Sequence, residues 1–212
     1  MGPAGVVEEL KHDQIDRAAQ ETALSITKKL RSNRWVGSAI LKITPMYEAR
    51  KICNLILSRF DAHLFNLTNL RLNKLLYFIH GHSLIDRESG LVRNHFEAWQ
   101  YGPVVRVVYD AFKPFNERAI TSPATFLDYS TGRTTTIPFD DIIPRDASFI
   151  VDVCKTYASY TTGKLVALSH QERGAWDTVF SAQANNRQLS PRISDDLIRR
   201  EFLNEPVGKI QH

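Results

Sequence analysis

Histidine side chains that could bind a metal ion occur at two places in the sequence, His80-Gly81-His82 and His170-Gln171-Glu172. Zinc sites are built from three or four histidine, cysteine or carboxylate ligands at recurring spacings. The first place lacks a third ligand at a known spacing, and the second lacks the paired histidines of the His-Glu-x-x-His motif. The sequence therefore predicts no metal site, and nothing in it indicates a cofactor.

The two cysteines, Cys53 and Cys154, are the candidates for a nucleophile. A reactive cysteine needs a neighbouring base or cation that stabilises the thiolate, whereas burial among apolar residues raises the thiol pKa. Both cysteines lie in apolar periodic segments, so we predict two buried, reduced thiols. The chain also lacks a Gly-x-Ser-x-Gly elbow, a phosphate loop and a dinucleotide fingerprint. We therefore predict that the protein is not an enzyme.

An aromatic cluster stands in the segment EAWQYGPVVRVVYDAF, residues 97–112. Its first part alternates like a strand, which would point Trp99 and Tyr101 to the same side. A break is expected at Gly102, followed by a helix from Pro103, since a missing N–H costs nothing at the first helical position. Aromatic residues at such a corner could pack in the core, line a catalytic pocket or hold a partner. For each residue taken alone, core packing is the commoner outcome.

Composition places the chain among soluble globular proteins. It has 212 residues, 43% of them hydrophobic and 24% charged, with a net charge of +4. No apolar run is long enough to span a membrane, and the first residues do not resemble a signal peptide, so we expect a cytoplasmic protein. The basic clusters at 28–34 and 199–200 look like solvated helix faces rather than a nucleic-acid-binding surface.

Helices must position most of these residues, because apolar side chains recur at three- and four-residue spacing along most of the chain. The predicted helices cover residues 14–31, 47–60, 69–80, 103–112, 147–160, 163–169, 175–184 and 195–203. Thr68, Thr161 or Thr162, and Ser194 are the expected N-caps, since their hydroxyl oxygens can accept a backbone N–H.

The helix over 69–80 has two distinct stripes in the sequence. Leu72, Leu75, Leu76 and Ile79 form its apolar stripe, and Asn69, Asn73, Tyr77 and His80 form the other. Tyr77 is therefore expected to be dispensable for the packing of the apolar face. Gly81 stands where a glycine commonly ends a helix.

One β-hairpin is predicted over residues 124–138, where Thr-rich alternating arms flank the turn Ser130-Thr131-Gly132-Arg133. Together these elements predict an α+β protein that is predominantly α-helical: a compact helical domain with a small antiparallel β element and an N-terminal accessory helix. The expected division is an extension over 1–45, a domain over 46–204 and a tail over 205–212.

The order of four segments resembles the Panacea domain of SocA-like antitoxins, also described as phage-associated GepA-like proteins. The segments are LTNLRLNKLLYFIHGHSL, FEAWQYGPVVRVVYDAF, LSHQERGAWDTV and ISDDLIRREFL. The resemblance runs from about Tyr47 to Asn204. The family usually has a small residue where Ile79 stands and often has glutamine at the position of His80, which argues against a chemical role for this histidine.

The resemblance implies an antitoxin that binds its cognate toxin directly, the toxin being encoded by a neighbouring gene. It also implies which residues shape the partner-binding region: Tyr77, His80, Trp99, Tyr101, Gly102, Pro103, His170, Glu172 and Trp176. We expect the aromatic and charged members of this set to converge on one region. We expect the Glu172 carboxylate to satisfy the Tyr101 hydroxyl or the His170 imidazole there, since buried polar groups need partners.

Two alternatives stay open at this point. An antitoxin of this kind could act as an adaptor that delivers the toxin to a protease. It could also bind its own promoter DNA as an autorepressor through the basic N-terminal helix that carries Lys28, Lys29 and Arg31. The function of residues 1–45 lies outside the resemblance.

Overall fold

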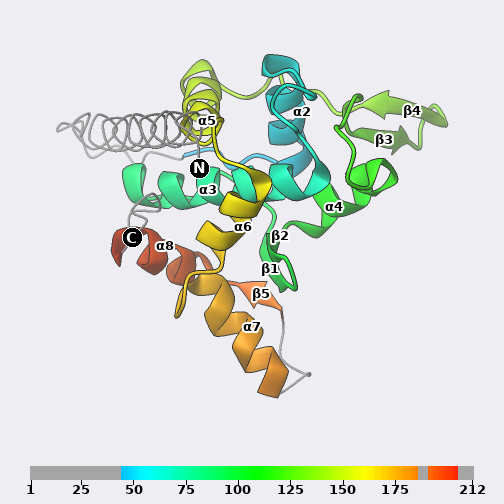
Figure 1. The fold of residues 1–212 in the computed structure, drawn as a ribbon. Coiled ribbons are helices and arrows are strands. Elements are labelled where there is room, and N and C mark those ends of the chain that lie inside the picture. Colours follow the sequence, from blue (N-terminus) through cyan, green and yellow to red (C-terminus); the bar gives the residue numbers. More distant parts are fainter. Residues whose placement is uncertain (1–43, 186–190, 205–212) are drawn as a thin grey trace, which may run out of the picture.

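The structure is a computed structural model that describes residues 44–185 and 191–204 (Figure 1). The helix predicted over 14–31, with its basic residues, and the tail over 205–212 lie outside the described residues. The described helices are α2 (Ala49–Arg59), α3 (Asn69–Asp86), α4 (Arg106–Phe112), α5 (Pro144–Thr156), α6 (Thr162–Ser169), α7 (Ala175–Asn185) and α8 (Asp195–Asn204), with a 3-10 turn, η1 (Lys113–Phe115). The predicted predominantly helical α+β fold is confirmed. Within the described ranges, no helix is long and apolar enough to cross a membrane.

Helix α3 runs through the middle of the molecule, with the other elements packed around it (Figure 1). The Thr68 hydroxyl caps its start by accepting a hydrogen bond from the Arg71 N–H, as predicted. The helix does not end at Gly81, as the sequence analysis expected, but continues to Asp86. An added Cβ at Gly81 would lie 2.3 Å from the Phe202 ring of α8. This glycine therefore serves close helix–helix packing rather than helix termination.

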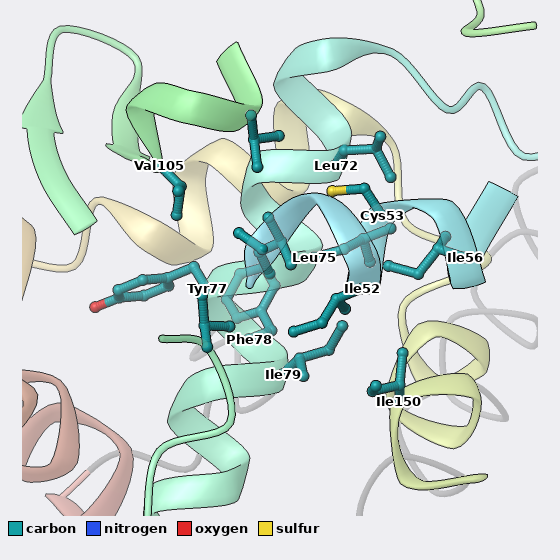
Figure 2. Packing of buried hydrophobic residues seen from close by; sticks show 14 of the residues in the cluster. Ile52, Cys53, Ile56, Leu72, Leu75, Tyr77, Phe78, Ile79, Val105 and Ile150 are labelled. Atoms are coloured by element: carbon teal, nitrogen blue, oxygen red, sulfur yellow. The ribbon is translucent and has the colours of Figure 1, made fainter. Parts of the chain in front are cut away.

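The expectation that Tyr77 is dispensable for packing is wrong. Its side chain is 0% exposed, and its ring makes edge contacts with Phe78, Phe96 and Phe202. Figure 2 shows the Tyr77 ring extending to the side of α3 opposite Ile52 and Ile56. The physical reason is that elements cover α3 on all sides, so its second stripe is also buried.

Polar side chains of α3 are buried because each satisfies main-chain groups of its neighbours. The Arg71 guanidinium donates to the carbonyl oxygens of Tyr157, Ala158 and Tyr160. These residues directly follow the C-terminal end of α5. Carbonyl groups at a helix end have no partner within the helix, so such a cation supplies one. One α3 residue therefore fixes where α5 ends.

A three-stranded antiparallel sheet packs beside α3, with strand order β2-β1-β5. Its strands are β1 (Phe96–Trp99), β2 (Gly102–Val104) and β5 (Arg192–Ile193). Gln100 and Tyr101 form the turn between β1 and β2, so Trp99 and Tyr101 do not share a strand face, and that prediction is wrong. Pro103 lies in β2, and the helix begins at Arg106 instead. Proline is tolerated there because β2 is an edge strand.

The predicted hairpin over 124–138 is confirmed as β3 (Thr125–Asp128) paired with β4 (Arg133–Thr136). The predicted caps of α6 and α8 are also present, since Thr161 accepts from the Lys164 N–H and Ser194 from the Leu197 N–H. These elements follow local rules closely, so sequence alone locates them.

The hydrophobic core forms where α2, α3 and α5 meet (Figure 2). Cys53 and Cys154 are both buried and free, as predicted. Burial raises the pKa of both thiols, that of Cys154 to about 12. Neither cysteine is therefore available as a thiolate nucleophile at neutral pH.

Candidate functional site

The β1–β2 turn, residues 99–103, is held to the body of the protein by two long-range hydrogen bonds. The Lys74 ammonium of α3 donates to the Pro103 carbonyl oxygen at 3.0 Å. The Trp176 indole N–H of α7 donates to the Trp99 carbonyl oxygen at 2.8 Å. Just beyond the turn, the Asn73 side chain accepts a hydrogen bond from the Val105 N–H at 2.8 Å. Side chains of α3 thus occupy the free edge of β2, which fixes the turn in place.

The Trp99 side chain is held by contacts with three neighbouring side chains. Its indole N–H donates to the Glu97 carboxylate at 2.8 Å, and its ring meets Tyr109 edge-on at 4.9 Å. The Arg106 guanidinium lies 5.1 Å from the same ring and donates to Glu97 at 2.7 Å. Burial disfavours a charged Glu97, but the hydrogen bonds from Arg106 and Trp99 outweigh it and lower the Glu97 pKa. The result is a rigid aromatic surface beside an anchored cation.

Tyr101, at the tip of the turn, is 63% exposed. It borders an open pocket of about 950 Å³. The pocket lies between the turn, the start of α3, α4 and the segment after it, and its lining is Asn69, Leu70, Asn73, Trp99, Gln100, Tyr101, Val104, Tyr109, Lys113, Asn116, Glu117 and Arg118. We call this feature the aromatic pocket. It combines exposed aromatic area with polar groups on rigid backbone, the combination typical of protein-binding surfaces.

A polar cluster lies behind the turn, over Gly102. This glycine has φ of +95°, and an added Cβ there would lie 2.6 Å from the Lys74 ammonium, 2.8 Å from the Ser169 hydroxyl and 3.0 Å from the His170 Nε2. His170 stacks on Trp176 with ring centroids 3.8 Å apart. Gly102 is therefore needed both for its backbone conformation and for the space above it.

The two basic groups of this cluster are shifted toward their neutral forms. Burial lowers the pKa of Lys74 to about 7. Burial, followed by repulsion from Lys74, lowers the pKa of His170. Both groups therefore bind protons less tightly in the folded protein than in the unfolded chain.

A Lys74→Met variant is expected to lose a pH dependence of stability that the wild type has. Unfolded Lys74 has a pKa of about 10.4, above its folded value, so the unfolded chain binds the proton more tightly. The wild-type free energy of unfolding, taken relative to Lys74→Met, should rise between about pH 7 and pH 10, by at most about 1.4 kcal/mol per pH unit. Urea unfolding of both proteins from pH 7 to 9 measures this, and parallel pH profiles would contradict it.

Tyr77 and His80 lie in the interior, away from the aromatic pocket. The Tyr77 hydroxyl donates to the Glu201 carboxylate at 3.0 Å, and the same carboxylate oxygen accepts the Ala175 N–H at the start of α7. Burial, and then the Glu201 charge, raise the pKa of Tyr77.

His80 Nδ1 accepts the Val92 N–H, and its Nε2 lies 3.2 Å from the Asp195 carboxylate at the start of α8. Both residues position α7 and α8, and their buried side chains leave no surface for direct contact with a partner.

The sequence-predicted set is thus brought together in part. Trp99, Tyr101, Gly102, Pro103, His170 and Trp176 meet around the β1–β2 turn. Glu172 is exposed in the segment between α6 and α7, and its carboxylate does not accept the expected hydrogen bond from Tyr101 or His170 in the structure. Tyr77, another tyrosine of the predicted set, instead donates to the buried carboxylate of Glu201.

Sequence reasoning missed Lys74, Glu97, Arg106, Tyr109 and Glu201. One signal for Lys74 was available, because it stands next to Asn73 in an otherwise leucine-rich helix. Nothing local marks Glu201, whose partner Tyr77 is 124 positions away. Among the described residues, no group of histidine, cysteine and acidic side chains is arranged to hold a metal ion.

Comparison with known proteins is consistent with these observations. A family model described as "Antitoxin SocA-like, Panacea domain" matches residues 72–177, which cover most of α3, most of the aromatic pocket and the start of α7. The chain is 35% identical over 164 residues to Antitoxin SocA of Caulobacter vibrioides (strain NA1000 / CB15N), covering 76% of this chain and 85% of that protein. No solved structure matches the chain significantly.

Proposed function

We propose that this chain, which belongs to the family of SocA-like antitoxins with a Panacea domain, neutralises a cognate toxin protein by binding it directly. The toxin is the product of an adjacent gene. In this proposal the chain is not an enzyme, and it acts by occupying a surface that the toxin needs.

The aromatic pocket is the observation that carries this proposal. Tyr101 projects from a turn that Lys74 and Trp176 hold in place, so little conformational entropy is lost when a partner covers it. Aromatic and arginine side chains on rigid backbone commonly provide most of the binding energy in protein interfaces. The anchored Trp99 and Arg106 pair next to Tyr101 fits that description.

Co-expression with the adjacent gene tests the proposed function. The expected result is that the adjacent gene alone arrests growth, that the antitoxin restores it, and that the two proteins co-purify. Purified antitoxin should also inhibit the purified toxin without any protease. Growth rescue that requires a cellular protease would instead favour the adaptor alternative, and absence of both rescue and co-purification would contradict the proposal.

Replacing Tyr101 with alanine is expected to weaken toxin binding by about thirtyfold or more, as truncation of a central aromatic residue commonly costs about 2 kcal/mol. Stability should change by less than about 0.5 kcal/mol, because the side chain is 63% exposed. Isothermal titration calorimetry and thermal unfolding measure the two effects.

The matched control is Leu203→Ala, which removes another exposed apolar side chain, 54% exposed, on α8. Leu203 is not part of the aromatic pocket, so this variant should bind the toxin like the wild type. If Tyr101→Ala bound the toxin as tightly as the wild type does, the toxin would have to bind elsewhere on the surface.

A further inference from the structure

The β3–β4 hairpin projects from the body of the protein on the side of α2 and α4 (Figure 1). All four residues of β4 are exposed, as are the first three of β3. Phe126, Leu127 and Tyr129 are among the exposed large hydrophobic residues of the described chain, and Tyr129 is 91% exposed. An isolated two-stranded hairpin is marginally stable in water, so a feature must hold this one in place.

Asn54 of α2 supplies that anchor. Its buried side-chain amide donates to the carbonyl oxygens of Ala124 and Ile137, and its side-chain oxygen accepts the Ala124 N–H at 2.7 Å. The Asn54 carboxamide thus bridges the two arms where they enter the body. At the other end, the Asp128 carboxylate accepts hydrogen bonds from Ser130 and Thr131 and stabilises the turn.

The register of the hairpin determines which main-chain groups face outward. The Ile137 N–H donates to the Ala124 carbonyl, so this pair lies at a hydrogen-bonded position of the ladder. Hydrogen-bonded and non-hydrogen-bonded pairs alternate in antiparallel strands. The pairs Leu127–Thr134 and Thr125–Thr136 are therefore non-hydrogen-bonded. The N–H and C=O groups of Thr134 and Thr136 consequently point away from β3.

The outer edge of β4 carries no lysine, proline or bulge that would block strand pairing. Edge strands are commonly blocked by lysine, proline or a bulge. Here the strand is Arg133-Thr134-Thr135-Thr136, whose threonines favour β-structure and whose single charge stands at the turn end. In Figure 1, β3 lies on the side of the hairpin nearer to α4, and β4 forms the outer edge.

We propose that the outer edge of β4 is a second toxin contact, at which an extended segment of the toxin adds to the hairpin as a third, antiparallel or parallel strand. This inference rests on the proposed function. Recognition through main-chain hydrogen bonds suits a protein partner with an exposed strand edge, and places few demands on the side chains of that partner.

A second copy of this chain fits the edge less well. Four residues extend over about 13 Å, so pairing through this edge alone would bury far less than the roughly 800 Å² per partner of a stable protein interface. A toxin bound at the aromatic pocket needs no such area from the hairpin, because the hairpin contact then adds to an existing interface.

The variant Thr134→Pro tests the proposal. It removes an outward-facing N–H while leaving the ladder between β3 and β4 intact, as proline is tolerated at such edge positions. We expect affinity for the purified product of the adjacent gene to fall about tenfold, since one hydrogen bond is lost and the ring blocks close approach. The control Thr134→Val keeps the N–H and should bind within about twofold of the wild type.

Hydrogen–deuterium exchange of residues 133–136 provides a second readout. Exchange in the wild type should slow when the toxin is added, with no such change in the free chain at increasing concentration. If the wild type binds the toxin and Thr134→Pro binds equally, the strand-addition proposal is overturned while the proposed function stands. If the wild type does not bind, both fail. If the free chain dimerises and Thr134→Pro abolishes the dimer, the occupant is a second copy and the proposal is wrong.

Discussion

Replacing Tyr77 with alanine is expected to lower the free energy of unfolding by about 3–5 kcal/mol, the range measured for large aromatic side chains removed from protein cores. Tyr77 is fully buried, and its ring contacts aromatic residues of α3, β1 and α8. The loss is a large part of the roughly 5–15 kcal/mol by which a domain is stable. Urea unfolding measures it directly, and toxin neutralisation should decline with the folded fraction.

The variant Tyr77→Phe keeps the ring and removes the hydroxyl, so it measures the contribution of the hydroxyl alone to stability. It leaves Glu201 without one hydrogen-bond donor and should cost about 1–3 kcal/mol while preserving toxin binding. If Tyr77→Ala kept its thermal midpoint but lost neutralisation, Tyr77 would contact the toxin directly, and the interior role described here would be wrong.

Replacing Gly102 with alanine is expected to destabilise the protein by about 2–6 kcal/mol and to abolish toxin neutralisation. A side chain at φ of +95° is strained by about 1–3 kcal/mol. The added methyl group also crowds the buried Lys74 and Ser169 and the half-buried His170, which costs about 1–3 kcal/mol more. Relief of this crowding would shift the turn that carries Tyr101. Chemical unfolding and co-purification with the adjacent gene product measure the two effects.

Gly132→Ala is the matched control for this variant. Gly132 also has a positive φ, of +66°, but an added Cβ there would meet no atom within 4 Å. The control therefore reports the backbone strain without the crowding, and it should cost about 1–2 kcal/mol. If the two glycine substitutions lowered the free energy of unfolding equally, the crowding at Gly102 would cost nothing, because the polar cluster behind the turn would have moved aside.

The parts of the fold that follow local rules could be predicted from the sequence. The hairpin over 124–138 follows from its turn and Thr-rich alternation, and the starts of α6 and α8 follow from Thr161 and Ser194. Pro103 was assigned to a helix because proline suits the first helical turn. It lies in a strand because Asn73 and Lys74, on a distant helix, satisfy the main chain around it. Nothing in the sequence near Pro103 indicates these contacts with Asn73 and Lys74.

The candidate site could be predicted only in outline. The aromatic residues near the β1–β2 turn and the His170–Trp176 pair were identified as one region, and they do lie together. Tyr77 was placed at the surface because an amphipathic pattern implies one solvated face. That rule fails for α3, where α8 covers the second face, and α8 lies more than a hundred residues later in the chain.

The placement of α8 also governs when the protein can fold during its synthesis. Phe202 fills the space left by Gly81, and Glu201 pairs with Tyr77, 124 residues earlier. At translation rates of about 5–20 residues per second, roughly 6–25 seconds separate the synthesis of these two partners. Throughout that interval the nascent chain lacks the helix that covers this part of α3 in the folded protein. The part of the core around Tyr77 and Gly81 can therefore be completed only after α8 has been synthesised.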